Sequence, residues 1–306
     1  MDTPTVQAPT FKGLKFNVKE EFIKYFLGLC AFLSVVTTAA IVFILVKESL
    51  VFFGNVSVKE FLTGTRWVPL LEPSSFGVLP LLWGTMLITI GAAFIALPLG
   101  LACAVFMSEF ASEKTRSIVK PILELLAGIP TVVYGYFALT FITPLLRTIS
   151  PEVEVFNAAS GAIVVGIMIL PMVASLSDNA LRAVPDSLRQ CGYALGATQY
   201  EVTTKIVVPA GLSGIMASFL LAISRAIGET MAVTLAAGAT PNLSTDIFAS
   251  IQTMTAYIVQ VSLGDTPQGG TAYQTLFAVA ALLFVVTLII NVISQRILDH
   301  YREAYD

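Results

Sequence analysis

Charged residues divide this chain into long, mostly apolar stretches. The uncharged stretches are Tyr25–Val46, Pro73–Ser108, Leu125–Leu146, Val155–Ser177, Ile206–Ser224 and Thr266–Gln295. The fifth continues past two charged residues, Arg225 and Glu229, to Thr245. Each stretch can hold a helix of about 20 residues that crosses the hydrocarbon core of a bilayer. The pattern therefore predicts an all-α polytopic membrane protein with six transmembrane helices.

Composition supports this fold class. Of 306 residues, 56% are hydrophobic and 12% are charged, about half the charged share of an average soluble domain. The glycines and prolines inside the stretches are tolerated in membrane helices, because neighbouring helices satisfy the freed backbone groups. The expected domains are an N-terminal segment 1–24, a six-span domain 25–295 with an inner loop 184–209, and a tail 296–306.

Basic residues predict the orientation of the spans, because cytoplasmic loops retain Lys and Arg. With the N-terminus inside, twelve of the seventeen basic residues lie on the cytoplasmic side: Lys12, Lys15, Lys19, Lys24, Lys114, Arg116, Lys120, Arg182, Arg189, Lys205, Arg296 and Arg302. Four lie on the opposite side: Lys47, Lys59, Arg66 and Arg147. The remaining one is Arg225. We expect a multi-pass protein of the cell (inner) membrane with both termini cytoplasmic.

Several chemistries are disfavoured by the residues available. His300 is the single histidine, and Cys30, Cys103 and Cys191 are far apart, so neither a zinc site nor a disulfide framework fits. The chain has no Gly-Lys dipeptide and hence no Walker-type phosphate loop. A net charge of -3 does not suggest nucleic acid. We expect no catalytic residues, no metal and no cofactor, so ATP hydrolysis would need a separate subunit.

The longest inner connection is VPDSLRQCGYALGATQYEVTTKIVVP, Val184 to Pro209. Pro185 and Asp186 are typical of a helix start. Gly196 is a candidate turn, and Gln199 to Val207 form a second helical stretch. The pattern predicts two short helices around a glycine that protrude on the cytoplasmic side.

This connection resembles the EAA loop of binding-protein-dependent ABC importer permeases. The matching elements are Gly196, a nine-residue spacer, and Ile206-x-Val208-Pro209. The EAA positions hold Gln190, Cys191 and Gly192, so the glutamate and both alanines of the pattern are absent, and Val208 replaces a leucine. The resemblance implies that these seven residues belong to a loop that docks an ATPase. The alternative is an ordinary amphipathic loop.

Three further segments resemble the permeases of high-affinity phosphate importers. They are FGVLPLLWGTM (Phe76–Met86), LLAGIPTVVYGYFAL (Leu125–Leu139) and SRAIGETMAV (Ser224–Val233). The resemblance implies a MetI-like fold of six helices in contact with membrane lipid. It also implies a second permease subunit, a dimer of ATP-binding subunits, and an extracytoplasmic binding protein that delivers phosphate.

Arg225 and Glu229 are the only charged residues between Ile206 and Thr245. On one continuous helix they would share a face rich in small residues and could touch, since they are four residues apart. One interpretation is an ion pair that fixes helix packing. The other, which we favour because ionisable residues inside spans usually mark a substrate path, is that Arg225 binds phosphate oxygens through its planar fork. Glu229 would then prevent overly tight binding and accept a proton that phosphate carries and sulfate lacks.

Other charges have simpler interpretations. Lys120 and Glu124 are expected to form an interfacial pair, and Glu109, Glu113, Lys114 and Arg116 a solvated inner loop. The function predicted from the sequence is the permease subunit of an ATP-driven importer for inorganic phosphate. The alternatives are an importer of another oxyanion such as sulfate or molybdate, an ion-coupled secondary transporter, or a structural membrane subunit.

Overall fold

The computed structural model describes residues 18–264, 267 and 269–301. These residues are mainly helical, as expected, with one two-stranded antiparallel pair that joins Trp67 to Phe76 and Val68 to Ser75. Residues 1–17 of the expected N-terminal segment 1–24 and residues 302–306 of the expected tail 296–306 lie outside the described residues. The chain divides into two compact units, one up to Lys47 and one from Glu48 onward.

Helix α1 (Val18–Asn55) runs through the first unit and into the second. From Glu21 to Ile41 every residue is exposed, although most are apolar. An apolar helix with exposed side chains around its whole circumference is the pattern expected of a segment surrounded by lipid.

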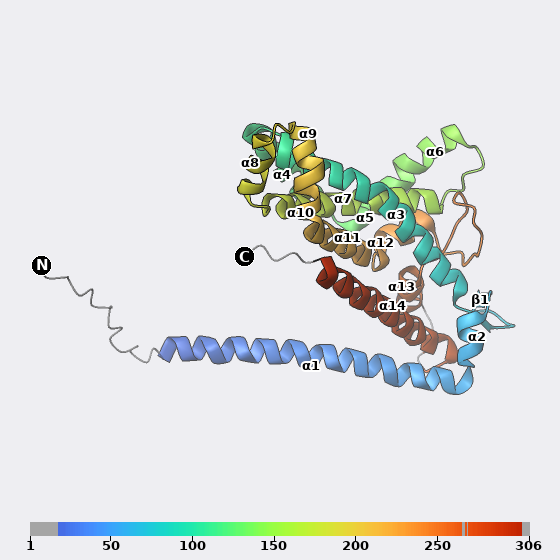
Figure 1. Cartoon of the computed structure of the whole chain (residues 1–306). Coiled ribbons are helices and arrows are strands. Elements are labelled where there is room, and N and C mark those ends of the chain that lie inside the picture. The colour runs from blue at the N-terminus through green and yellow to red at the C-terminus, as the bar shows by residue number, and fades with distance from the viewer. Residues whose placement is uncertain (1–17, 265–266, 268, 302–306) are drawn as a thin grey trace, which may run out of the picture. The chain divides into compact units, whose positions relative to one another are not determined.

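The second unit contains the remaining elements (Figure 1). In chain order they are α2 (Val58–Thr63), β1 (Trp67–Val68), β2 (Ser75–Phe76), α3 (Leu79–Val105), η1 (Phe106–Phe110), α4 (Glu113–Ala127), α5 (Thr131–Phe137), η2 (Ala138–Ile142), α6 (Thr143–Ile149), α7 (Ala158–Arg182), α8 (Asp186–Ala194), α9 (Gln199–Val202), η3 (Thr203–Val207), α10 (Val208–Ala210), α11 (Leu212–Ile227), α12 (Met231–Ala237), α13 (Met254–Leu263) and α14 (Thr271–Tyr301). The segments η1, η2 and η3 are single π-helical turns.

Among the described residues, five helical segments are long and apolar enough to cross a membrane: Glu21–Asn55, Leu79–Phe110, Thr131–Ile149, Ala158–Arg182 and Thr271–Ile297. A sixth span is obtained if Gln199–Ala210 and Leu212–Ile227, which meet at 68°, are taken as one bent span. The expected polytopic helical fold is therefore confirmed.

The expected third span, 125–146, begins too early. Helix α4 ends at Ala127, and α5 begins only at Thr131, after Pro130 at its N-cap. Proline lacks an N–H and restricts the residue before it, which favours a break at this place. Helix α4 is therefore a separate amphipathic helix, with Leu123 buried and Leu125 73% exposed.

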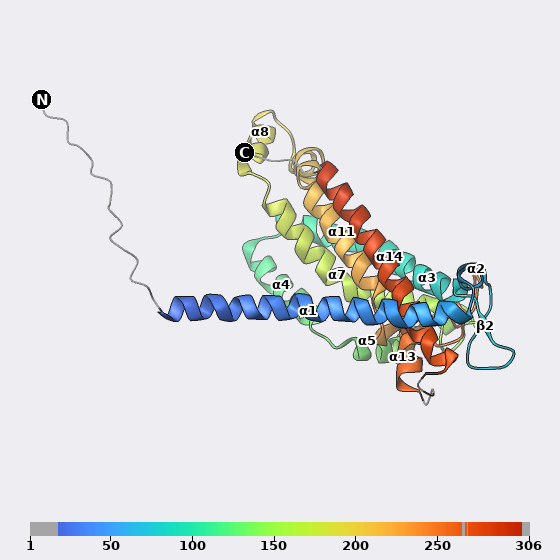
Figure 2. The ribbon, with the colours of Figure 1, turned by 90° about the horizontal axis from the view of Figure 1, so that it is seen from below.

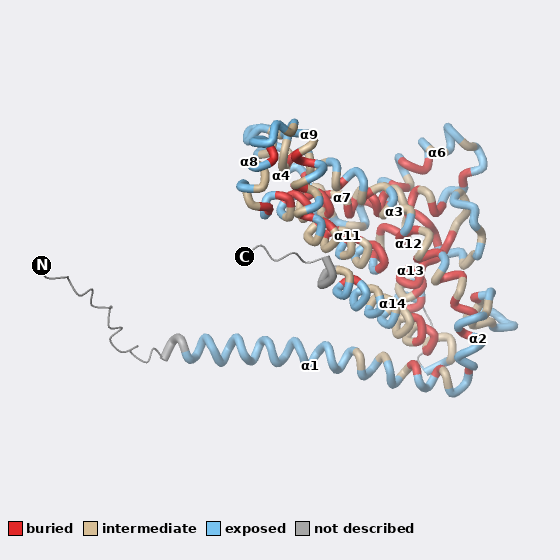
Figure 3. Tube along the Cα trace, viewed as in Figure 1, coloured by how far each residue is buried: buried red, intermediate tan, exposed pale blue. Residues whose placement is uncertain are grey.

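Among the described elements of the second unit, helices α3 and α7 share the most extensive contact, and buried residues concentrate there (Figure 3). A Cβ atom added at Gly91 would lie 2.7 Å from the Cβ of Ala162, and one at Gly100 would lie 2.7 Å from the Cβ of Val173. Small residues allow helix backbones to approach closely. Helix α11 lies beside both α7 and α14 (Figure 2).

Candidate functional site

The fifth span breaks between the two charged residues predicted to act together. Helix α11 ends at Ile227, Gly228 follows as its C-cap, and α12 begins at Met231. The expectation of one continuous helix through both charges is therefore wrong. Glycine favours such a break, because its backbone loses the most freedom in a helix. Among the described residues, no ion pair joins Arg225 to Glu229 in this structure.

Glu229 is held by the backbone on the far side of the break. Its side-chain Oε1 accepts a hydrogen bond from the amide of Ala232 at 3.2 Å, and its carbonyl oxygen accepts one from the hydroxyl of Thr255 at 2.7 Å. The residue is only 8% exposed. Hydrogen bonds from backbone N–H groups stabilise a carboxylate, so Glu229 is partnered without Arg225.

Arg225 faces a cavity of about 430 Å³ between α4, α7 and α11. The cavity is lined by Leu123, Glu124, Ala127, Met168, Pro171, Met172, Ser175, Leu176, Leu221 and Arg225. Most of this lining is apolar. Within the part of the chain that the structure describes, Arg225 is the only basic residue of the lining and has no hydrogen-bond or ion-pair partner.

The helix face that was predicted to be rich in small residues does pack against α7. This packing extends along α11 as far as the cavity. A Cβ atom at Gly214 would overlap the Cβ of Ala180, and the hydroxyls of Ser218 and Ser177 are 2.7 Å apart. One helical turn beyond Ser218, Leu221 lines the cavity, and Arg225 follows after another turn. The packing therefore directs this face toward the cavity.

The inner loop forms the two short helices that its sequence predicts. Helices α8 and α9 flank Gly196, whose φ of +81° favours glycine. Thr198 and Glu201 form a capping box at the start of α9. The amide and hydroxyl of Thr198, followed by Lys205, lower the pKa of the Glu201 carboxyl.

Close packing at Gly192 explains one departure of this loop from the EAA pattern, the absence of the second alanine. A Cβ atom at this position would lie 2.7 Å from Cδ1 of Ile206 and 2.9 Å from Cγ2 of Val202. Glycine therefore lets α8 pack closely against the second helix of the loop. Gln190, Cys191, Gly196 and Pro209 are exposed, and Ile206 and Val208 are partly buried. The loop surface also exposes Tyr193 (46%), Leu195 (89%) and Tyr200 (69%).

Glu109 and Arg189 form a buried ion pair that the sequence interpretation missed. Their side chains are 5% and 14% exposed, and Nη2 of Arg189 lies 3.0 Å from Oε1 of Glu109. This hydrogen bond raises the pKa of Arg189, and charge attraction raises it by a smaller amount. Burial acts in the opposite direction and lowers the pKa. The expected solvated inner loop is therefore wrong at Glu109.

A second buried pair joins α4 to α7. Nη2 of Arg116 lies 2.8 Å from Oδ2 of Asp178, whose side chain is 1% exposed, and Nε of Arg182 lies 3.7 Å from the other oxygen. The prediction of a solvated loop is wrong for Arg116 as well. The sequence did contain one signal of a structured charge cluster here, because Asp178 and Arg182 are four residues apart at the end of a span.

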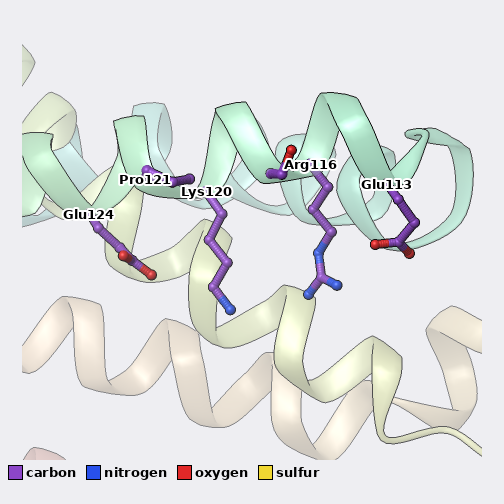
Figure 4. A pocket seen from close by; sticks show the side chains of 6 residues that line it. Glu113, Arg116, Lys120, Pro121 and Glu124 are labelled. Carbon is purple, nitrogen blue, oxygen red and sulfur yellow. The ribbon is translucent and has the colours of Figure 1, made fainter.

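The expected pair of Lys120 and Glu124 does not form within the described part of the chain. Both instead line a pocket of about 360 Å³ on α4, together with Glu113, Arg116, Ser117 and Pro121. Figure 4 shows the four charged side chains projecting from the same side of the helix. Among the described residues, no group of three His, Cys, Asp or Glu residues could hold a metal ion.

The described residues form a bundle of membrane helices with two short helices, α8 and α9, after the fourth span, and the chain's sequence assigns this bundle to a class of transport permeases. The sequence matches the family described as "Binding-protein-dependent transport system inner membrane component" over residues 96–299. The chain belongs to this family. It is therefore a multi-pass transport component of the inner membrane, and this family membership argues against a secondary transporter.

Relatives with known names agree with this assignment. The chain is 37% identical over 273 residues to the probable ABC transporter permease protein YqgH of Bacillus subtilis. The matched region covers 87% of this chain and 88% of the relative. The chain is 34% identical over 259 residues to the phosphate transport system permease protein PstC of Mesorhizobium japonicum, covering 78% of each.

Solved structures support the fold. One chain of the MetNI methionine ABC transporter, in an inward-facing conformation, has a TM-score of 0.58 at 18% identity, covering 76% of this chain and 100% of that chain. A chain of a bacterial alginate ABC transporter, in complex with an alginate-bound periplasmic protein, has a TM-score of 0.63 at 16% identity, covering 90% and 94%. The MetI-like permease fold expected from the sequence is confirmed.

Proposed function

We propose that this chain is the PstC-type permease subunit of an ATP-driven importer for inorganic phosphate, and that Arg225 and Glu229 line the substrate path. Relatives named PstC support the choice of substrate. The observation that carries the proposal is the guanidinium of Arg225, which has no partner among the described residues and lines a largely apolar cavity.

Arg225 is suited to bind an oxyanion at this place. A guanidinium is always charged and presents a planar set of donors that matches two oxygens of a phosphate. Among the described residues, neither Glu229 nor Glu124, the acidic residue of the cavity lining, forms an ion pair with Arg225. The positive charge of Arg225 therefore remains available for an anion that enters the cavity.

Glu229, four residues after Arg225, supplies a hydrogen-bond acceptor. Its Oε2 has no partner among the described residues, whereas Oε1 is occupied. Phosphate near neutral pH carries a proton that it can donate, and sulfate carries none. An acceptor that becomes buried when the anion binds, and stays unpaired, disfavours an analogue that lacks the donor, so Glu229 would favour phosphate over sulfate.

The proposed partners follow from the loop and the family. They are a PstA-like second permease, a dimer of PstB-like ATPase subunits, and a PstS-like phosphate-binding protein on the outer side. We infer that the ATPase docks on the coupling loop, the segment 184–209 that includes Gln190, Cys191, Gly192, Gly196, Ile206, Val208 and Pro209. The exposed Tyr193, Leu195 and Tyr200 support a protein contact there, since exposed apolar groups often mark interaction surfaces.

This arrangement requires both termini to be cytoplasmic, which thiol labelling can test. Single cysteines placed at Thr65 and Gly269 should react with a membrane-impermeant reagent in intact cells, and a cysteine at Ser187 should not. The native cysteines Cys30, Cys103 and Cys191 are first replaced by serine. Labelling at position 187 from outside would contradict the proposed orientation.

Transport measurements at matched protein levels test the substrate path. Arg225→Lys should retain the charge and the assembly but lose most phosphate uptake, because an ammonium group cannot bind two oxygens in the planar geometry. Glu229→Gln should assemble and transport less phosphate in the presence of sulfate, because it removes the carboxylate proposed to distinguish the two anions. Arg296→Lys, which alters another exposed arginine, is the matched control.

The double substitution Arg225→Met with Glu229→Leu decides between transport and packing. If this variant assembles and imports phosphate at the normal rate, the two residues are not part of the path. Uptake of sulfate or molybdate in place of phosphate by the unaltered complex would instead assign the importer to another oxyanion.

A further inference from the structure

Arg189 connects three elements at the inner end of the second unit. Its Nε and Nη2 donate to the two carboxylate oxygens of Glu109 at 3.3 and 3.0 Å. Nη2 also donates to the carbonyl of Leu181 at 2.8 Å, and Nη1 donates to the carbonyl of Val184 at 2.6 Å and to Asp186 at 3.1 Å. A guanidinium has five N–H donors, so every donor of Arg189 is used.

These contacts join the coupling loop to two spans. Arg189 lies on α8, Leu181 lies at the end of α7, and Glu109 lies in η1, which continues α3 without interruption. The carbonyl of Glu109 also accepts a hydrogen bond from the side chain of Gln199 on α9. A single residue at the end of α3 therefore binds both helices of the loop.

Beneath this polar contact lies an apolar cluster shared by the loop and the same spans. It includes Ala104 of α3, Leu181 of α7 and Val202 and Val207 of the loop. Apolar contacts are non-directional, so they hold the loop against the spans without fixing its orientation. The forked contact between Arg189 and Glu109 is directional and can fix it.

Movement passed to α3 and α7 reaches the cavity of Arg225. The two helices approach too closely at Gly91 and Gly100 to leave room for a methyl group, so they are expected to move together. Helix α7 supplies Met168, Pro171 and Met172 to the cavity lining. A displacement of α7 therefore displaces one wall of the candidate substrate path.

We propose that Glu109 and Arg189 are positioning residues of coupling, which lock the coupling loop to α3 and α7 so that an ATPase-driven displacement of the loop moves the cavity wall. The inference rests on the proposed function, in which the loop docks an ATPase. Neither residue lines the cavity of Arg225. Without the lock, the loop still packs on the spans and docks the ATPase, but it turns relative to them when it is displaced.

The test measures phosphate imported per ATP hydrolysed in the purified complex, reconstituted with its ATPase, second permease and binding protein. Glu109→Gln and Arg189→Lys should retain the copurifying ATPase subunit, because the exposed surface of the loop is unchanged. The transport ratio should fall by roughly tenfold, a typical size for an allosteric coupling. Glu109→Ala, which leaves no acceptor, should lower the ratio further than Glu109→Gln.

Lys205→Gln is the matched control. Lys205 pairs with Glu201 at 3.3 Å within the loop, and this pair is exposed and does not connect the loop to α3 or α7. This variant should keep the ratio of the unaltered complex. A normal ratio in Glu109→Gln and Arg189→Lys would overturn the inference, and so would loss of the ATPase from these variants, because the contact would then maintain only the docking surface.

A chemical cross-link provides a second, independent measurement. Glu109→Cys and Arg189→Cys are combined in a chain whose Cys30, Cys103 and Cys191 are serine. A short bis-maleimide should raise the transport ratio of this variant, whereas N-ethylmaleimide, which modifies the same thiols without joining them, should not. A cross-linked complex that binds the ATPase but keeps a low ratio would contradict the proposal.

Failure of the proposed function would look different. In that case the unaltered complex would not import phosphate or would not bind an ATPase, whereas failure of the coupling inference leaves both activities intact. If the complex imports another oxyanion, the same ratio measured with that anion tests Glu109 and Arg189 equally.

Discussion

Replacing Arg116 by methionine should loosen α4 from α7. Arg116 is 15% exposed and lies 2.8 Å from Asp178, whose side chain is 1% exposed. Methionine keeps an apolar stem but removes the guanidinium, so the carboxylate of Asp178 would remain buried. Its remaining cation, Arg182, is 3.7 Å away and 38% exposed.

The expected magnitude follows from the burial of the pair. Removing one member of a buried ion pair commonly costs about 3–5 kcal/mol, because the other charge stays buried without compensation. Arg182 offsets part of this loss, so we expect a cost of about 3 kcal/mol, at the lower end of that range. This corresponds to roughly a hundredfold increase in the equilibrium constant for opening α4.

Amide hydrogen exchange of the peptide that covers α4 measures this opening. In Arg116→Met, exchange at Leu123 should accelerate by roughly two orders of magnitude in the same detergent. Combining Arg116→Met with Asp178→Leu should reverse most of the change, since apolar replacement of a buried pair is often neutral. Unchanged exchange in the single variant, or equal acceleration in the double variant, would refute the reasoning.

Three further predictions concern the coupling loop. Gly192→Val should destabilise the loop because its Cβ would lie 2.7 Å from Cδ1 of Ile206, and Ile206→Ala in the same chain should restore thermal stability. Gly196→Val forces a β-branched residue to a φ of +81°, at a cost of about 1–2 kcal/mol. Substrate-stimulated ATP hydrolysis should therefore fall in this variant, and it should fall less in Gly196→Asn. Glu201 has a lowered pKa in the folded loop, so it contributes stability above its ordinary pKa and loses it as the pH falls through the folded value. The difference in melting temperature between the wild type and Glu201→Gln should therefore be present at neutral pH and disappear in acid.

The spans could be predicted because the apolar stretches are long and the charges between them few. The breaks inside the stretches were harder to predict. Proline and glycine in 128–130 separate α4 from α5, but similar residues within α7 leave it continuous. Whether such a residue interrupts a membrane helix depends on whether neighbouring helices satisfy the freed backbone groups, and a local pattern does not contain that information.

The candidate site was predictable in its parts but not in its pairing. Arg225 stood out because it is charged within an apolar run, and its cavity agrees with that interpretation. Its expected partner Glu229 binds the amide of Ala232 instead, because the helix ends between them. The pairs Glu109–Arg189 and Arg116–Asp178 join residues 80 and 62 positions apart, and such separations carry no signal in one sequence.

The π-helical turn η3 has a consequence for chain length in this family. A π-helical turn accommodates one residue more than an α-helical turn. A one-residue deletion within Thr203–Val207 can therefore convert η3 into α-helix, while the flanking helices still turn the same side chains toward their neighbours. The same deletion between Leu212 and Leu221 would turn the rest of α11 by about 100° and move Arg225 out of the cavity. Between Thr203 and Arg225, homologues that differ in length should therefore carry one-residue deletions within η3 and none between Gly211 and Arg225.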